Sequence, residues 1–138
     1  NAAAVGKYLI CSKYTSEDLI KSSGLIPVKV PQGYVKCNLA VVDDSHVITE
    51  DRGIAKALSS LDDIRSLLIA SHEVQLPGHE YGFIGGAAGR MGGRMIFNGD
   101  LSRHSCCEEI EDFCRSCGVE PVFFDSYPLT DIGSIFII

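Results

Sequence analysis

A cysteine next to a lysine is the first feature of this sequence that could do chemistry. Cys37 follows Lys36 in an apolar segment, and a neighbouring ammonium group lowers the pKa of a thiol. A thiolate nucleophile also needs a base and an orienting carboxylate, and the histidines that could act as base include His46 and His79. Nothing in the spacing brings them to Cys37, so a buried cysteine in mid-strand is the competing interpretation. The carboxylates considered for the same site are Asp43, Asp44, Glu50, Asp51 and Asp100.

Two of these carboxylates occupy matching positions in separate parts of the chain. Asp51 and Asp100 each end a short polar stretch between an apolar run and an expected helix. A carboxylate there accepts hydrogen bonds from the free N–H groups of the first helical turn, so N-capping is the favoured interpretation. If the strand ends converge, the same carboxylates can bind a cation. Together with Lys36 and Asn38 they are the candidate ligand-binding residues, and Cys37 is the candidate catalytic residue.

A cluster of thiols could suggest a metal site. Its members are His104, Cys106, Cys107, Cys114 and Cys117. However, three of these cysteines fall with Ile110 and Phe113 on one face of a helix expected over residues 105–117, and acidic residues cover the opposite face. Cysteine then acts as a small apolar core residue, and we expect no metal.

A glycine-rich segment at residues 82–93 could suggest a phosphate-binding loop. It contains neither of the glycine spacings that open a phosphate-binding helix, and a strand is expected to follow it. We therefore expect close backbone packing and a hairpin turn at this segment, and no nucleotide or other cofactor.

The elements that must position these residues repeat along the chain. Gly33, Gly82 and Gly133 lie 49 and 51 residues apart, and each opens an apolar segment. The repeating unit is strand, turn, strand, helix, strand, and its period of about 50 residues is typical of propellers and other repeat architectures. Alternating strands and helices indicate the α/β class. The expected boundaries are modules at residues 8–32, 33–81 and 82–132 and a final strand at 133–138.

Some expectations are more local. A helix is predicted from Thr15, with Asp18 at the capping-box spacing, to Gly24. Residues 34–42 are predicted to form a strand, which places Cys37 in its middle. Residues 1–4, Asn-Ala-Ala-Ala, look like a vector-derived remnant ahead of a domain at residues 5–138, and we expect the natural protein to extend further toward its N-terminus.

Composition narrows the class of protein. A chain of 138 residues with 46% apolar side chains can bury a core. A net charge of −6 argues against binding to nucleic acid, which depends on Lys and Arg. The apolar runs are too short for a bilayer, and no basic amphipathic stretch indicates a membrane surface. Without a signal-peptide pattern, the six cysteines are expected to be reduced thiols in the cytoplasm.

Six short motifs occur together in this order. They are Gly33-Tyr34-Val35-Lys36-Cys37, Ile48-Thr49-Glu50-Asp51, Leu76-Pro77-Gly78, Tyr81-Gly82-Phe83-Ile84-Gly85-Gly86, Asn98-Gly99-Asp100-Leu101 and Asp131-Ile132-Gly133-Ser134. In combination they resemble a bacterial, mostly clostridial family of unknown function that is assigned to the guanidino-group-modifying enzyme fold, also called the pentein fold. The resemblance covers the chain from about Tyr8 to Ile138. It implies a pentein-like α/β propeller of five ββαβ modules, of which this chain holds about three, at the C-terminal end.

The resemblance also implies a chemistry. Active penteins attack a guanidinium carbon with a cysteine thiolate, use a histidine as acid and base, and bind the cation with carboxylates. The segment that matches the nucleophile's position, residues 133–137, has no cysteine, and no histidine lies in residues 34–42 or 83–88. We therefore expect a protein that binds a small cationic guanidino-type molecule without the deiminase residues. The alternatives are a hydrolase or amidinotransferase with Cys37 as nucleophile, and a non-catalytic assembly module that forms homo-oligomers through its open edges.

Overall fold

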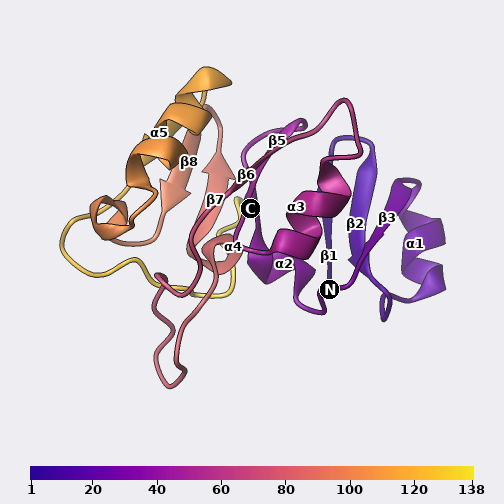
Figure 1. Cartoon of the computed structure of the whole chain (residues 1–138), viewed down its shortest axis with the longest axis horizontal. Coiled ribbons are helices and arrows are strands. Elements are labelled where there is room, and N and C mark those ends of the chain that lie inside the picture. Colours follow the sequence, from indigo (N-terminus) through magenta and orange to yellow (C-terminus); the bar gives the residue numbers. More distant parts are fainter.

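Three β-β-α-β units follow one another in the computed structural model, which describes residues 1–138 (Figure 1). The first unit contains β1 (Ala2–Val5), β2 (Tyr8–Ser12), α1 (Glu17–Ser23) and β3 (Ile26–Val30). The second contains β4 (Leu39–Val41), β5 (His46–Thr49), α3 (Arg52–Leu58) and β6 (Arg65–Leu68). The third contains β7 (Ala88–Met91), β8 (Arg94–Phe97), α5 (Cys107–Ser116) and β9 (Glu120–Val122), with a 3-10 turn at Leu101–Arg103. Two short helices, α2 (Val35–Asn38) and α4 (Ile84–Ala87), precede the second and third units.

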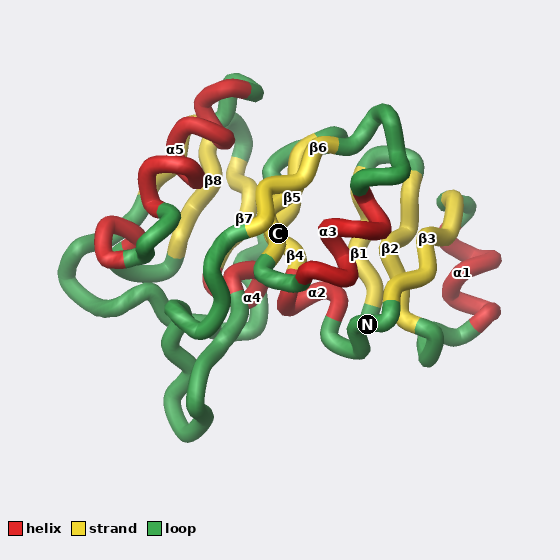
Figure 2. Tube along the Cα trace, viewed as in Figure 1, coloured by secondary structure: helices red, strands yellow, loops and turns green.

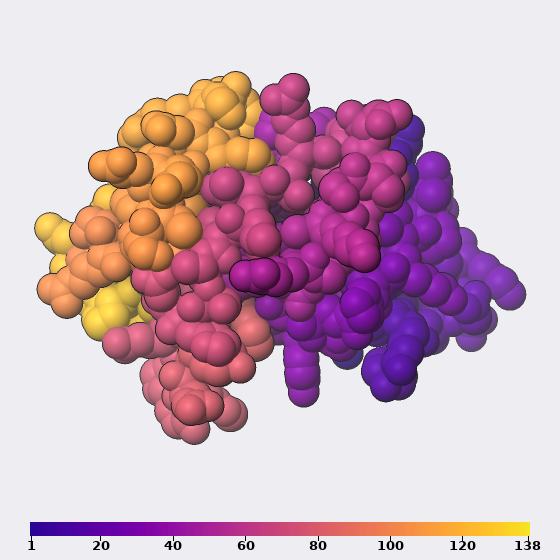
Figure 3. All heavy atoms as spheres, viewed as in Figure 1, coloured from indigo at the N-terminus to yellow at the C-terminus, as the bar shows by residue number.

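Each unit has its own three-stranded sheet with the same topology (Figure 2). The first two strands pair antiparallel, and the second and third pair parallel through a helical crossover. This confirms the α/β class and the repeating unit predicted from the sequence. The three units follow the chain order along the long axis, as the colours of Figure 3 show, and their sheets remain separate, so no closed ring is formed.

The first unit begins earlier than expected. Residues 2–4 belong to β1, which pairs with β2 from Ala2 opposite Cys11 to Val5 opposite Tyr8. Ala3 and Val5 are buried in the core. The first sheet therefore includes most of the residues that the sequence suggested were vector-derived.

A strand at residues 34–42 was predicted, and this prediction is wrong for its first half. Residues 35–38 form the helical turn α2, and only residues 39–41 are extended. The Asn38 backbone N–H and its side-chain Nδ2 both donate to the carbonyl oxygen of Tyr34, at 3.1 Å each, and close the turn. The corresponding turn α4 packs against α2 at the backbone of Gly85, so the two turns lie side by side.

The longer helices lie close to their predicted positions. The first is capped by Ser16, not by Thr15, because the Ser16 hydroxyl accepts the Leu19 N–H whereas Thr15 bonds to the N-terminal segment. It ends at Gly24, whose φ of 66° is readily adopted by glycine. The α5 helix covers most of the range expected for it. No helix in the structure combines the length and apolar character needed to cross a bilayer.

Strands β4 and β5 of the middle sheet are largely buried on both faces, whereas β6 is partly exposed. Neighbouring strand residues point to opposite faces. Val47 packs into a cluster shared with the first unit, and Ile48 packs into a larger cluster shared with the third. The second unit therefore joins the other two through two separate cores.

The predicted final strand is absent. Residues 133–138 form no regular element, and Phe136 is 73% exposed. Ile135 instead lies against Gly89, where an added Cβ would meet its backbone oxygen at 2.4 Å. Ile135 therefore packs on β7 without joining a sheet, whereas the last three apolar side chains, Phe136, Ile137 and Ile138, stay largely exposed.

Candidate functional site

The candidate nucleophile Cys37 lies on α2 and is half-buried. Burial and the Asp131 carboxylate raise the pKa of its thiol, and together they outweigh the lowering by Lys36. The ammonium of Lys36 lies 3.5 Å from the Gly85 carbonyl oxygen and 5.4 Å from the centre of the Phe136 ring. Burial lowers the pKa of Lys36 itself. No histidine is hydrogen-bonded to Cys37.

The two helix-start carboxylates cap helices as predicted. The Asp51 side chain accepts the Ile54 N–H at 2.8 Å, and Asp100 accepts the Ser102 N–H at 3.0 Å. The other oxygen of Asp51 accepts a hydrogen bond from Gln32 Nε2 at 2.8 Å. Asp51 and Asp100 line different hollows, so they do not converge on one ligand.

Asn38 stabilises the α2 turn and its contact with β5 from within the core. It is buried, its side chain closes the α2 turn, and its carbonyl oxygen accepts the Thr49 hydroxyl at 2.7 Å. The hydrogen bond from Thr49 ties α2 to the end of β5. Asn38 therefore holds in place the two residues that follow Thr49.

The first of these, Glu50, is the most unusual carboxyl group of the chain. It is only 8% exposed; Oε2 accepts the Ile84 N–H at 2.8 Å, and Oε1 is buried without a hydrogen-bond partner. Burial raises its pKa to about 7, a rise that the Ile84 N–H opposes and the carboxylates of Asp131 and Glu73 strengthen. A buried oxygen without a partner costs stability, and a buried acid of raised pKa often marks a functional site.

Glu50 borders a hollow of about 390 Å³, which we call the Glu50 hollow. Its lining residues are Gln32, Tyr34, Asn38, Glu50, Asp51, Ser71, His72, Tyr81 and Phe83. The first five come from the second unit and the segment before it, and the last four from the loop between β6 and α4. The volume lies in the range of small-molecule sites.

Aromatic rings form the loop side of this hollow. His72 stacks on Tyr81 with ring centres 3.8 Å apart, and Tyr81 meets Phe83 edge to face at 5.8 Å. His72 has a φ of 68°, the only positive φ outside glycine, and its stacking on Tyr81 helps to hold the backbone in this unfavourable conformation. The loop is anchored where the Gln75 N–H donates to Leu129 O at 2.8 Å. The rings are therefore positioned before any ligand binds.

Sequence reasoning missed Asp131, which organises the glycine-rich segment. Its carboxylate accepts the N–H groups of Phe83 at 2.9 Å and Gly133 at 2.8 Å. A Cβ on Gly86 would lie 1.9 Å from Asp131 Oδ1. The prediction of close backbone packing here is confirmed, and Gly92, with a φ of 57°, provides the predicted hairpin turn.

The cysteine-rich face of α5 packs as predicted. Ile110 and Cys114 are fully buried, and Cys106, Phe113 and Cys117 are partly buried against the same cluster. Burial raises the pKa of Cys114 to about 12, as expected for a thiol among apolar groups.

The Glu50 hollow thus combines an acid without a full set of partners, a second carboxylate and an aromatic wall. The sequence placed Asn38 and Asp51 among the ligand-binding candidates, and both line this hollow. His72 is an exposed loop residue, and no local sequence pattern shows that its loop folds back beside Glu50.

Comparison with known proteins places the chain in one family. Residues 1–136 match a family of unknown function, DUF6873. No curated protein and no solved structure matches the chain. Because the match spans nearly all residues, the protein belongs to the DUF6873 family.

Proposed function

We propose that the Glu50 hollow binds a small organic cation of the guanidino type and that the protein acts as a binding protein. The observation that carries this proposal is the Oε1 atom of Glu50, which is buried without a hydrogen-bond donor. A cationic N–H group in the hollow would supply that donor and the opposite charge together. Such charge-assisted hydrogen bonds are about twice as strong as neutral ones.

The rest of the lining fits the same ligand. Asp51 adds a second carboxylate next to Glu50, and its oxygens retain further accepting positions beside the bonds from Ile54 and Gln32. The rings of Tyr81 and Phe83 offer faces that attract cations. A planar guanidinium with its fork of donors suits a carboxylate beside aromatic rings better than a compact ammonium does.

We also propose that the three units are part of a pentein-like arrangement. The first strands of the three sheets border a common hollow of about 520 Å³, together with residues 135–137. In a propeller the innermost strands of successive modules meet at the axis in this way. A binding role is favoured over guanidino hydrolysis because Cys37 lies outside the lining of the Glu50 hollow and its thiol pKa is raised.

Agmatine binding measured by calorimetry at pH 8 tests the cation proposal. We expect one site per chain, and we expect Glu50→Gln to weaken it at least tenfold because the neutral amide removes the charge. Glu80→Gln is the matched control, since it removes the same charge from an exposed position in the adjoining loop. Butylamine should bind more weakly than agmatine. Equal affinities for the wild type and the Glu50→Gln variant would place any binding elsewhere.

The pH dependence of agmatine binding provides a second measurement. Because the pKa of Glu50 is raised to about 7, the empty site is largely protonated below pH 7 and must release a proton to bind a cation. Affinity should fall by up to about tenfold per pH unit below 7 and level off above it. This slope should disappear in the Glu50→Gln variant. A flat profile in the wild type would contradict the assignment.

A further inference from the structure

Three side chains with metal-binding atoms meet at a junction between the second and third units. Asp43 lies in the turn between β4 and β5, His46 is the first residue of β5, and Cys117 follows α5. A carboxylate oxygen, an imidazole nitrogen and the Cys117 sulfur all lie within 4.8 Å of one another. Asp43 and His46 were considered in the sequence only as partners for Cys37, but the structure places them beside a different thiol.

Each of the three is held in position. The Ser45 N–H donates to Asp43 Oδ1 at 2.8 Å, and His46 Nδ1 lies 2.9 Å from the same oxygen. The His46 ring meets the edge of Phe113 with ring centres 5.5 Å apart. Cys117 is the C-cap of α5, and its backbone N–H bonds to the helix. All three residues are partly buried, so ordering them on a ligand costs little further conformational entropy.

We propose that Asp43, His46 and Cys117 form a zinc-binding site that joins the second and third units. Thiolate, imidazole and carboxylate are the ligand types that Zn²⁺ takes from proteins, and three protein ligands with one open position are typical of sites that keep a water. Such a mixed set suits Zn²⁺ better than Mg²⁺ or Ca²⁺, which prefer oxygen ligands alone.

The geometry requires only a small adjustment. Ligand atoms on a tetrahedral zinc ion lie about 3.3–3.8 Å apart, as the metal–ligand bond lengths dictate. The contact between Asp43 and His46, at 2.9 Å, is shorter than this, and all three atoms lie within 4.8 Å of one another, so side-chain rotations that move them by about an ångström or less are enough. The two negative charges of a carboxylate and a thiolate balance the charge of the ion.

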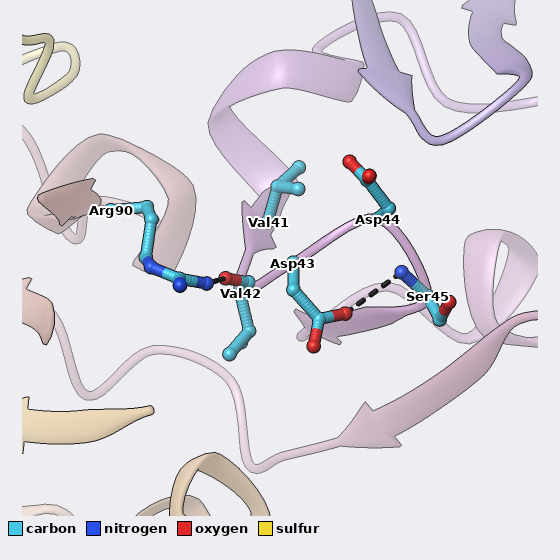
Figure 4. Close-up of a pocket in the computed structure, with 6 residues that line it drawn as sticks. All are labelled: Val41, Val42, Asp43, Asp44, Ser45 and Arg90. Atoms are coloured by element: carbon cyan, nitrogen blue, oxygen red, sulfur yellow. Dashed lines mark hydrogen bonds between the residues drawn. The ribbon is translucent and has the colours of Figure 1, made fainter. Parts of the chain in front are cut away.

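Asp43 also lines a hollow of about 510 Å³, so this side of the proposed site lies next to solvent (Figure 4). Figure 4 shows the Asp43 carboxylate turned toward the Ser45 backbone, and Arg90 bonded to the carbonyl oxygen of Val42. A zinc-bound water could therefore exchange with solvent through this hollow.

A metal explains the trio better than a nucleophilic thiol does. The Cys117 thiol donates to the carbonyl oxygens of Cys114 at 3.2 Å and Phe113 at 3.7 Å, and it makes no hydrogen bond to the imidazole. Burial and Asp43 raise its pKa, which disfavours a free thiolate. A bound Zn²⁺ displaces the thiol proton and stabilises the thiolate directly.

Cobalt(II) and zinc titrations of the full chain test the proposal. Co²⁺ should bind one to one and produce a thiolate-to-cobalt charge-transfer band that Zn²⁺ abolishes. We expect Cys117→Ser to remove the band and His46→Gln to weaken Co²⁺ binding by about 100-fold or more. Zn²⁺ should also raise the thermal midpoint of the wild type but not of either variant.

Two variants serve as controls. Cys106→Ser removes the thiol of the residue that precedes α5, at the opposite end of the helix from Cys117. His79→Gln removes an exposed histidine. Both variants should bind Co²⁺ like the wild type. If Cys117→Ser does not fold, the band and affinity in His46→Gln decide the matter. The proposal is overturned if the wild type gives no charge-transfer band, if the band persists in Cys117→Ser, or if His46→Gln binds with unchanged affinity.

Discussion

Replacing Gly85 with alanine is expected to destabilise the protein by about 3 kcal/mol or to prevent folding. The new Cβ would lie 2.5 Å from the carbonyl oxygens of Lys36 and Cys37 and 2.7 Å from that of Leu39. All three are backbone atoms at the contact between α2 and α4, so no side chain can rotate away. Overpacking of a rigid core contact costs about 1–3 kcal/mol and occasionally more. Urea denaturation followed by circular dichroism measures the change.

Gly93→Ala is the matched control for this substitution. Gly93 lies in the turn between β7 and β8, its φ is not positive, and a Cβ there would meet nothing within 4 Å. The stability of the Gly93→Ala variant should stay within about 1 kcal/mol of the wild type. A small increase is expected, because alanine lowers the conformational entropy of the unfolded chain. Similar stabilities for the Gly85→Ala and Gly93→Ala variants would show that α2 and α4 do not pack in this way.

The ionisation of Glu50 is expected to reduce stability as pH rises from about 4.5 to 7. Its pKa is 4.5 in the unfolded chain and about 7 in the folded one, so the folded state binds more protons over this range. Stability then falls with rising pH, the opposite of the usual carboxylate, and reaches its lower level above pH 7. The expected loss is about 3 kcal/mol. Unfolding curves measured at several pH values report it.

The Glu50→Gln variant isolates this contribution from other titrating groups. The amide resembles the protonated acid, and its oxygen can still accept the Ile84 N–H. Its stability relative to the wild type should increase between pH 4.5 and 7. Glu80→Gln should show no comparable change, because Glu80 is exposed. A constant difference between wild type and Glu50→Gln across this range would mean that Glu50 stays charged in the folded protein. The Glu50 carboxylate would then be ionised in the folded protein even when no cation is bound.

The repeating unit was predictable from the sequence because its signals are local. Turn residues and apolar runs recur at a fixed period, and the carboxylates of Asp51 and Asp100 cap the helices that follow them. The first half of the segment at residues 34–42 was misassigned for a related reason. Apolar side chains there suit a buried strand and a buried helical turn equally, and the choice depends on packing against Gly85, 48 residues from Cys37.

The candidate sites were only partly predictable. Asn38 and Asp51 stood out by type and position, but the aromatic wall comes from a loop whose path depends on its bonds to the third unit. Likewise, Asp43 and His46 are three residues apart, whereas Cys117 reaches them only because the third unit packs on the second. Contacts between units produce no repeating pattern of residue types, so a single sequence does not reveal them.

The unequal division of the apolar core implies unequal local stability. The outer face of the first sheet is covered by a cluster of only three buried residues, Leu9, Cys11 and Ile20, whereas the cluster shared by the second and third units has fifteen. Segments with few buried contacts open without global unfolding. Amide hydrogens of α1 and β3 should therefore exchange with solvent deuterium well before those of β5. The segment α1–β3 would then open as a separate cooperative unit while β1 and β2, which share a core with the second unit, stay folded with the rest of the protein.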